Sequence, residues 1–436
     1  MNFEVDARPA EIPVFLDRLI EISGAASWQQ REKDFARQLH DNPLMQRYLD
    51  IQFGIERSMI DVRRYRRTTG RRVPTLKNTL RADLGVLYSF AGMIARVFPR
   101  LPPSGQHALR GKIIGALKDN VGLAPVAYEM RTAAHFMAKG FDVEFHDLCH
   151  GGGYDFHVKN QDIEMNVECK SVSGDLGHRI HLLRQYQLGP YLFQDMKEQA
   201  KQGVVKLIVA TLPDRLHGQR EFMEAVAKRI SQALIEAKTM TDTEPCSVSY
   251  RELSIVGSPF NFPSRAQISE ADVMSYCNRM LGDEIGHVIM NFKPQESATV
   301  IALRSAQPNE FLVGLYRNLR EASHQLAGTK PGAICVEFRN LTSRQLREVA
   351  GSPSQSGKPT GLQQMTAKFF DSDTRANVHT LTYTAPGEFV RRSFQKLDTH
   401  STDLIHTTAF SEDAASYVFT NKRNPFVNDP RYRLFS

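Results

Sequence analysis

The residues whose types and spacing best suit catalysis lie in Gly151–Val172, GGGYDFHVKNQDIEMNVECKSV. Asp155 follows three glycines in one extended run, and Glu168 and Lys170 lie two positions apart in a second run. Because side chains alternate between the two faces of a strand, we expect Glu168 and Lys170 to point the same way and Cys169 the other way. If the two runs pair as a hairpin, Asp155 joins them. Two carboxylates and a lysine at one point can bind a hard divalent cation and orient the water that it activates.

The segments on either side of this stretch predict an α/β unit that would position these side chains. Apolar periodicity predicts a helix and then three strands, at Ala127–Lys139, Phe141–Leu148, Tyr154–Val158 and Ile163–Val172. Gly189 and Pro190 are expected to open a helix at Tyr191–Gln202, since proline suits the first helical turn. The apolar run Val204–Thr211 is typical of a central strand buried on both faces. With an amphipathic helix at Arg220–Lys238 and a strand at Ser247–Val256, this unit is expected to span residues 121–260.

The two flanking regions have different predicted characters. Residues 1–120 show helical spacing of apolar residues and are expected to form an all-helical region. Residues 261–436 are expected to form an α+β region, with strands at Ser297–Ser305 and Gly332–Phe338 on either side of a helix at Asn309–Leu326. This region also echoes the preceding one: NVECKSV can be aligned with VIALRSA, and DMKEQAKQ followed by VVKLIVA with NLREASHQ followed by GAICVEF. A degenerate repeat, with Ala302 in place of Glu168 and Arg304 in place of Lys170, and a chance likeness of two short units are both open interpretations.

Composition and charge narrow the class of protein. The 436 residues are 41% hydrophobic, which is ordinary for a folded protein with a sizeable core. Five cysteines, odd in number and without a CxxC pair, argue against a disulfide framework and a structural zinc site and favour a reducing, cytoplasmic interior. The N-terminal residues lack the basic start and apolar stretch of a signal peptide, and no segment is apolar over the roughly 20 residues that span a bilayer. We therefore expect no membrane segment.

The net charge of +7 is concentrated in one part of the chain. Residues 1–120 hold 20 Lys and Arg residues against 13 Asp and Glu residues, so the rest of the chain is neutral. Residues 62–82 carry eight basic residues and no acidic one. The arginines that we expect to contact nucleic-acid phosphates there are Arg63, Arg64, Arg66, Arg67, Arg71 and Arg72. The alternative is a solvated basic segment without a ligand.

The order of elements and acids resembles that of the PD-(D/E)XK nuclease superfamily, which has a restriction-endonuclease-like fold. The likeness covers about Ala127–Thr211 and is carried by GYDF with Asp155 and VECKS with Glu168 and Lys170. A tyrosine precedes Asp155 where the superfamily's name has a proline. The resemblance implies an α/β core with a mixed sheet flanked by helices, and a glutamine, here Gln199, in the helix after the lysine strand.

The resemblance and the residue chemistry together suggest the roles of the individual side chains. Asp155, Glu168 and the carbonyl of Cys169 would bind Mg²⁺ or Mn²⁺, and Glu129 would bind a second ion or its water shell. Lys170 would orient the attacking water and offset charge on the scissile phosphate. The structural alternative is a hairpin that merely carries an ion pair.

These features predict a metal-dependent deoxyribonuclease whose N-terminal region grips the nucleic acid. DNA is the expected partner because the superfamily acts mostly on DNA, while RNA and a homodimer stay open. One alternative keeps the fold without catalysis, as a nucleic-acid-binding or regulatory scaffold. Another is an unrelated α/β protein whose hairpin carries an ion pair.

Overall fold

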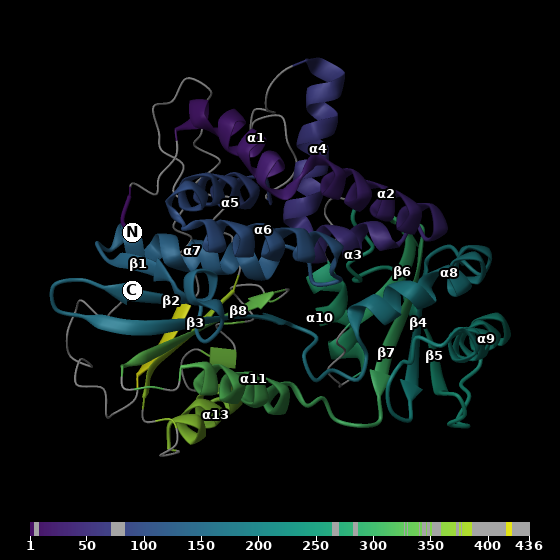
Figure 1. Cartoon of the computed structure of the whole chain (residues 1–436). Coiled ribbons are helices and arrows are strands. Elements are labelled where there is room, and N and C mark those ends of the chain that lie inside the picture. Colours follow the sequence, from purple (N-terminus) through teal and green to yellow (C-terminus); the bar gives the residue numbers. More distant parts are fainter. Residues whose placement is uncertain are drawn as a thin grey trace. The chain divides into compact units, whose positions relative to one another are not determined.

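The computed structural model divides the chain into two compact units. It describes residues 1–3, 8–70, 83–263, 270–281, 287–326, 330–339, 359–371, 377–385 and 416–420, with positions 328, 341, 346, 349, 350 and 375. The first unit comprises Met1–Ala36, Leu49–Leu176 and Leu312–Ser436, and the second comprises Arg37–Tyr48 and Gly177–Phe311. The elements are labelled in Figure 1.

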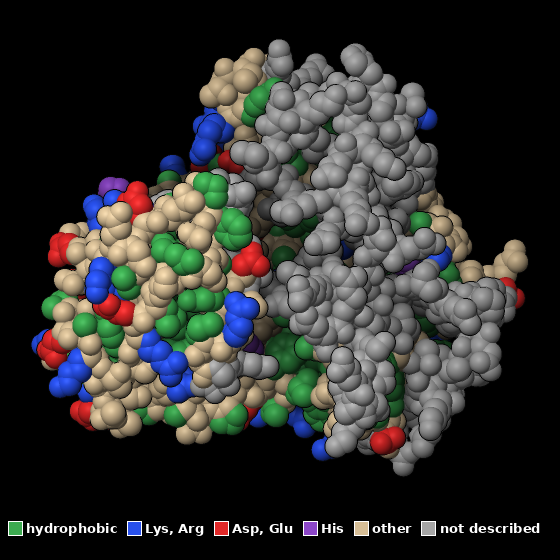
Figure 2. All heavy atoms as spheres, turned by 180° about the vertical axis from the view of Figure 1, so that it is seen from behind, with side chains coloured by type: hydrophobic (Ala, Val, Ile, Leu, Met, Phe, Trp, Pro, Cys, Tyr) green, Lys and Arg blue, Asp and Glu red, His purple; other side chains and the backbone are tan. Residues whose placement is uncertain are grey.

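The described residues show mixed surface charge and no membrane helix. On the face shown in Figure 2, basic and acidic side chains of the described residues are interspersed, so the described part of this face carries no extended basic surface. Within the described ranges, none of the helices combines the length and apolar character needed to cross a membrane.

The first unit is built around a six-stranded mixed sheet in the order β1-β2-β3-β8-β9-β10. The strands are β1 (Asp142–Phe145), β2 (Phe156–Lys159), β3 (Glu164–Ser173), β8 (Gly332–Arg339), β9 (Val378–Thr384) and β10 (Ser416–Thr420). The helices are α1 (Ile12–Ser23), α2 (Ala25–Asp41), α3 (Met45–Gln52), α4 (Gly54–Thr69), α5 (Asp83–Val97), α6 (Pro103–Lys118), α7 (Ala124–Ala138), α11 (Phe311–Gln325) and α13 (Gly361–Phe370). The unit boundaries fall within α2, within α3, after β3 between Leu176 and Gly177, and at the start of α11. The first three strands are antiparallel, whereas β3, β8 and β9 are parallel.

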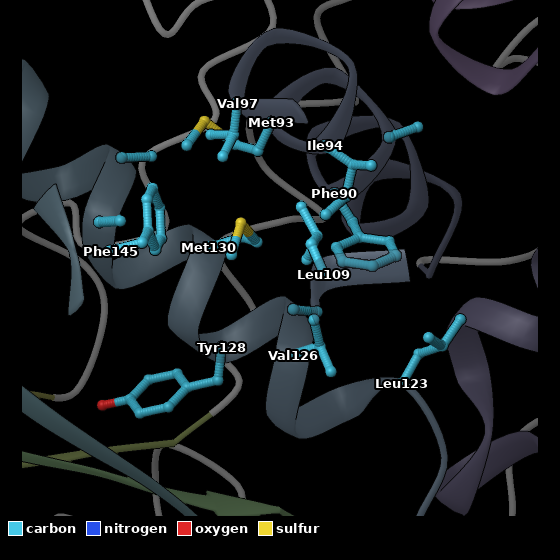
Figure 3. Close-up of a cluster of buried hydrophobic side chains, with 14 of the residues drawn as sticks. Phe90, Met93, Ile94, Val97, Leu109, Leu123, Val126, Tyr128, Met130 and Phe145 are labelled. Atoms are coloured by element: carbon cyan, nitrogen blue, oxygen red, sulfur yellow. The ribbon is translucent and has the colours of Figure 1, made fainter. Parts of the chain in front are cut away.

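Helix α7 forms the centre of the first unit's core. Its residues Val126 and Met130 pack with Phe90 and Ile94 of α5 and with Leu109 of α6 in one cluster (Figure 3). The same cluster continues into the sheet through apolar side chains of β1, β2 and β3. Burial on nearly every side makes α7 a rigid support for any polar side chain that it carries toward the sheet.

Helices α11 and α13 cover the opposite face of this sheet (Figure 1). In α13, Thr366 forms a buried hydrogen bond with Tyr383 of β9, with 2.9 Å between the hydroxyl oxygens. Arg375 lies over the rings of Tyr316 and Phe369, at 4.9 Å and 4.7 Å from their centroids. These contacts join both helices to each other and to the sheet.

The second unit contains a four-stranded mixed sheet in the order β5-β4-β7-β6. Its elements are α8 (Leu182–Glu198), β4 (Val204–Leu212), α9 (Arg220–Glu236), β5 (Ser247–Ser254), α10 (Glu270–Leu281), β6 (His287–Lys293) and β7 (Ser297–Ser305). In β4, Ile208 and Ala210 belong to the cluster that includes α8 and α9, whereas Leu207 and Val209 belong to the cluster that includes α10. The strand is thus buried on both faces, as its apolar run predicted.

The predicted α/β class, with mixed sheets flanked by helices, is confirmed. The prediction that Val204–Thr211 completes the sheet of Glu168 and Lys170 is wrong, because β4 pairs with β5 and β7 in the second unit. The strand beside β3 is instead β8, from the region expected to be separate. The expected ranges 1–120, 121–260 and 261–436 therefore do not coincide with the two units.

The predicted start of the helix at Pro190 is also wrong, because α8 begins at Leu182 and contains this proline. A proline inside a helix leaves the carbonyl four residues earlier without its N–H donor. That carbonyl belongs to Tyr186, and it accepts a hydrogen bond of 2.9 Å from the side-chain amide of Asn42. The sequence distance between Asn42 and Tyr186 is the reason that local rules could not foresee this compensation.

Candidate active site

The turn before β2 sets the position of Asp155. Gly151, Gly152 and Gly153 have φ values of 75°, 106° and 87°, a region that side chains strongly disfavour. The backbone N–H of His146 donates to the carbonyl oxygen of Asp155 at 2.9 Å, which closes the loop. The three glycines thus allow the chain to reverse and deliver Asp155 next to the first paired residue of β2.

The predicted hairpin is confirmed, and Asp155 reaches across it. Phe156 of β2 pairs with Val167 of β3 in an antiparallel ladder. One carboxylate oxygen of Asp155, Oδ2, accepts a hydrogen bond of 2.7 Å from the backbone N–H of Cys169. The N–H and C=O groups of a strand residue point to the same side, so the carbonyl of Cys169 also faces the Asp155 side of β3.

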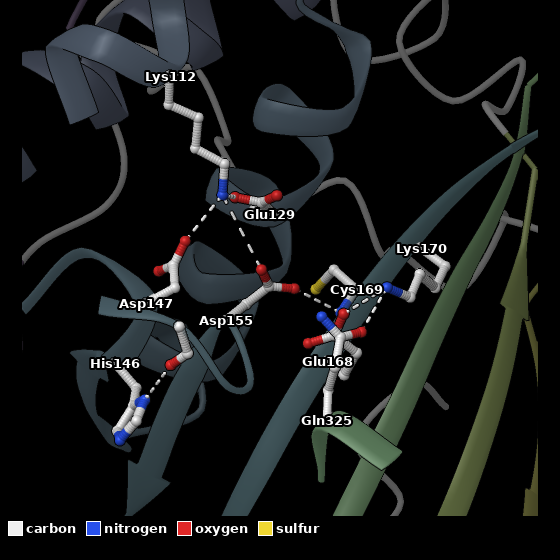
Figure 4. A network of polar contacts seen from close by, with 10 residues as sticks. Lys112, Glu129, His146, Asp147, Asp155, Glu168, Cys169, Lys170 and Gln325 are labelled. Carbon is white, nitrogen blue, oxygen red and sulfur yellow. Dashed lines mark hydrogen bonds and ion pairs between the residues drawn. The ribbon is translucent and has the colours of Figure 1, made fainter. Parts of the chain in front are cut away.

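A second group of charges meets Asp155 on the side of α7 (Figure 4). The ammonium group of Lys112, on α6, lies 2.5 Å from Glu129 Oε2, 2.9 Å from Asp147 Oδ2 and 3.9 Å from Asp155 Oδ1. Carboxylate oxygens of these three acids lie within 4.8 Å of one another, close enough to hold one metal ion. The sequence predicted Glu129 and Asp155 here but missed Lys112 and Asp147.

A third group extends the site toward α11. Lys170 Nζ lies 2.7 Å from Glu168 Oε1, so the two side chains point the same way as predicted. The same ammonium donates to Gln325 Oε1 at 2.6 Å. Figure 4 shows Asp155 between this group and the Lys112 group. Gln325 lies at the end of α11 and was not predicted.

Burial and mutual repulsion shift the pKa values of the acids. Burial, followed by the charge of Asp155, raises the pKa of Glu129 to about 8, although Lys112 opposes the shift. Burial and the charge of Asp155 also raise the pKa of Glu168 to about 8, against the effect of Lys170. Burial raises the pKa of Asp155 to about 6, although Lys112 and the Cys169 N–H oppose it. Clustered acids that resist ionisation are typical of sites that bind a cation.

The carboxylate oxygens of the site fit a divalent cation. Glu168 is only 2% exposed, and its Oε2 atom has no hydrogen-bond partner in the described part of the chain. Glu129, Asp147 and Asp155 add the hard oxygen donors that Mg²⁺ and Mn²⁺ prefer. The residues present therefore fit such an ion, which would favour the ionised form of each acid.

The assignment of Gln199 to the site stays a prediction. This residue follows the last residue of α8 in the second unit, whereas β3 lies in the first. The helix that contributes a glutamine to the lysine strand is α11, through Gln325. The alignment of DMKEQAKQ with NLREASHQ placed Gln325 opposite Gln202, three residues from Gln199, and was the signal that could have found it. Lys112 and Asp147 have no comparable local motif.

The predicted phosphate-contacting arginines are paired with acids where they are described. Arg63 and Arg67 lie 3.6 Å and 2.8 Å from oxygens of Glu32. Two further ion pairs join Arg64 to Asp61 at 3.9 Å and Arg66 to Asp17 at 2.5 Å. Arg71 and Arg72 lie outside the described residues.

Comparison with known proteins identifies no relative of this chain. No protein-family profile, curated protein or solved structure matches the chain. The likeness to the nuclease superfamily therefore stays a prediction based on the residues themselves.

Proposed function

We propose that the chain is a metal-dependent nuclease that hydrolyses phosphodiester bonds in DNA, with a PD-(D/E)XK-like site in its first unit. The observation that carries the proposal is the place of Asp155 between two groups of charges. Its Oδ1 atom faces Lys112 and Glu129, and Oδ2 binds the backbone beside Glu168 and Lys170. Acids from one helix, from β3 and from the turn before β2, with a lysine next to them, make up the chemical set that metal-assisted hydrolysis requires.

The side chains divide the chemistry between them. Asp155, Glu168, the Cys169 carbonyl and Glu129 would hold Mg²⁺ or Mn²⁺, which supplies Lewis acidity and a water of lowered pKa when bound. Lys170 would orient the attacking water and offset negative charge on the phosphate. Gln325 restricts the Lys170 ammonium through its hydrogen bond, as a positioning residue.

Cleavage of plasmid and linear DNA by purified protein tests this proposal. Mg²⁺ or Mn²⁺ should support cleavage by the wild type, EDTA should stop it, and Lys170→Ala should lower the rate at least a hundredfold. Lys159→Ala, which removes an exposed lysine of β2, is the matched control and should leave the rate unchanged. Equal cleavage by the wild type and Lys170→Ala would exclude the catalytic assignment.

A nucleic-acid-binding scaffold without catalysis is the second candidate. It is favoured by Lys112, whose ammonium pairs with three acids and offsets part of their negative charge without any metal. Under this alternative, fluorescence anisotropy in EDTA would show DNA binding, and no divalent metal would produce cleavage. Cleavage that is lost in Lys170→Ala would exclude it.

The contribution of α4 to DNA binding requires a separate measurement. Replacing Arg63, Arg64, Arg66 and Arg67 with alanine should weaken DNA binding and reduce the steepness of its dependence on salt. Because all four arginines already pair with acids, the loss should be smaller than that for four free cations. Unchanged affinity and salt slope would show that these arginines serve only the fold.

A further inference from the structure

The second unit contains a cavity of about 330 Å³ that is lined by basic side chains. Its wall is formed by Gly177–Arg179, His181, Arg184, Arg215–Gly218 and Glu310, all within this unit. Three arginines and three histidines line it, against one acid. Within the described residues, the cavity shares no residue with the cluster around Asp155 and has the opposite charge.

The three arginines of the cavity differ in how far their charge is already neutralised. Arg179 lies 3.4 Å from Asp214 and 3.2 Å from Glu310, so acids compensate its charge. Arg215 lies 3.5 Å from the other oxygen of Asp214, and its side chain is 54% exposed. Arg184 donates to the amide oxygen of Gln187 at 2.8 Å, and no carboxylate pairs with it among the described residues. Among the described residues, Arg184 is therefore the cavity arginine without a carboxylate partner, whereas Arg215 shares the single carboxylate of Asp214 with Arg179.

The guanidinium of Arg184 packs against Gly218 in the cavity wall. A Cβ atom at this position would collide with the Nη and Cζ atoms of Arg184, so the guanidinium packs directly on the glycine backbone. The planar fork of an arginine fixed in this way suits bidentate contact with phosphate oxygens. Alanine at position 218 would displace the fork without removing its charge.

Two long helices begin at the same cavity. Helix α8 starts after His181 and α9 starts after Gln219, and the side chain of neither N-cap residue caps its helix. The first turn of a helix has N–H groups without an intrahelical acceptor and carries a partial positive charge. Both helix ends therefore add to the attraction that the arginines exert on an anion.

We propose that this cavity is a binding site for a phosphate group carried by a nucleotide or a nucleic-acid strand. The observations that carry it are the cavity itself, the Arg184 guanidinium that has no carboxylate partner among the described residues and packs on Gly218, and Arg215, which shares one carboxylate with Arg179. A volume of about 330 Å³ lies at the lower end of small-ligand pockets and admits a phosphate with its sugar. The site adds a second place of phosphate contact to the chain, independent of hydrolysis at Asp155.

Binding of three probes to the full chain in EDTA tests the proposal and separates the two phosphate sources. The probes are AMP, a ten-residue oligothymidylate without a terminal phosphate and the same oligonucleotide with a 5′-phosphate. Binding of AMP and a preference for the 5′-phosphate identify a terminal phosphate as the ligand. Equal binding of the two oligonucleotides identifies the backbone phosphates. Absence of binding by all three probes at millimolar concentration would overturn the proposal.

Substitution of cavity residues provides the second part of the binding test. Arg184→Gln and Gly218→Ala should each weaken binding at least tenfold, or 1.4 kcal/mol, and Arg215→Gln should weaken it in the same direction. Lys228→Gln, an exposed position of α9, is the matched control. Thermal unfolding of each variant checks the fold, and Arg215→Gln remains informative if Arg184→Gln unfolds, because Arg215 is more exposed. Full affinity in folded Arg184→Gln and Arg215→Gln would exclude the site.

The outcome is separable from that of the proposed nuclease activity. All binding is measured in EDTA, where metal-dependent cleavage cannot occur. Loss of binding in Arg184→Gln with metal-dependent cleavage of short DNA retained supports a distinct site. Phosphate binding by a protein that cleaves nothing would uphold the cavity and reject the nuclease.

Discussion

Substitution of Lys112 by methionine gives the sharpest test of the acid cluster. The change keeps most of the side-chain length but removes the ammonium that contacts Glu129, Asp147 and Asp155. Removing one partner of a buried ion pair costs about 3–5 kcal/mol, because the remaining charge has lost its compensation. The Lys112 side chain is 29% exposed, so we expect a loss near the lower end, about 3 kcal/mol, in EDTA.

The loss of stability in Lys112→Met should depend on pH, and the protonation of the neighbouring acids determines its direction. Although burial alone would lower it, the charges of Glu129, Asp155 and Asp147 raise the pKa of Lys112, so the ammonium is charged throughout the accessible range. Glu129, with a pKa of about 8, can take up a proton at pH 6 and relieve the repulsion in the variant. The destabilisation by Lys112→Met should therefore be larger at pH 8.5 than at pH 6.

Mn²⁺ should reverse the effect of Lys112→Met. In the wild type the ion must compete with the ammonium for the same oxygens, whereas in the variant it meets three uncompensated carboxylates. A ligand present at 100 times its dissociation constant stabilises the folded state by about 2.7 kcal/mol. We expect Mn²⁺ to stabilise Lys112→Met more than the wild type, by about 1.4 kcal/mol for each tenfold gain in affinity.

Urea unfolding at pH 6 and pH 8.5, with EDTA or MnCl₂, measures all three effects. Lys118→Met, an exposed lysine on the same helix, is the matched control and should change stability by less than about 0.5 kcal/mol. If Mn²⁺ stabilises the wild type and Lys112→Met equally, the acids do not form a cation site that Lys112 occupies. If Lys112→Met is no less stable than Lys118→Met, the charge cluster does not contribute to the fold.

Three further predictions concern single hydrogen bonds and acids. Glu129→Gln should flatten the pH dependence of the free energy of unfolding in EDTA. In the wild type the folded chain keeps a proton on Glu129 that the unfolded chain releases above about pH 4.5, so stability should fall as the pH rises from there toward 8. Urea unfolding measures this trend. Asn42→Ala should cost about 1–3 kcal/mol in urea unfolding, because the Tyr186 carbonyl inside α8 loses its donor, and an unchanged midpoint would contradict this account. Gln325→Ala should lower kcat for DNA cleavage with little change in KM and shift its pH profile by freeing Lys170, while Gln325→Glu should keep the ammonium in place; identical profiles for both variants would exclude positioning.

Local patterns predicted most elements and the hairpin of the site. Alternating and apolar runs predicted β2, β3, β4, β7 and β8, because burial of a strand on one or both faces determines which of its positions are apolar. Asp155, Glu168 and Lys170 could be found because they lie on one hairpin, where spacing along the chain fixes spacing in space. Lys112 and Asp147 could not, since Lys112 lies on α6 and Asp147 begins the turn after β1, and no short motif records the packing that brings the two together.

The same distinction explains why the partner of β3 was assigned incorrectly. The segments β3-α8-β4 and β7-α11-β8 each place their two strands in different sheets, and β3 pairs with β8 while β4 pairs with β7, both in parallel. By its local sequence, each segment is a complete strand-helix-strand unit. Its sequence is therefore equally compatible with its two strands lying in one sheet and with each strand pairing with a strand of the other segment. When the strands pair between the segments, the helix that follows the lysine strand in sequence is not the helix that contacts this strand in the structure. Gln325 rather than Gln199 then contacts Lys170, and the weak likeness of the two segments becomes the part of the sequence that points to the site's missing residue.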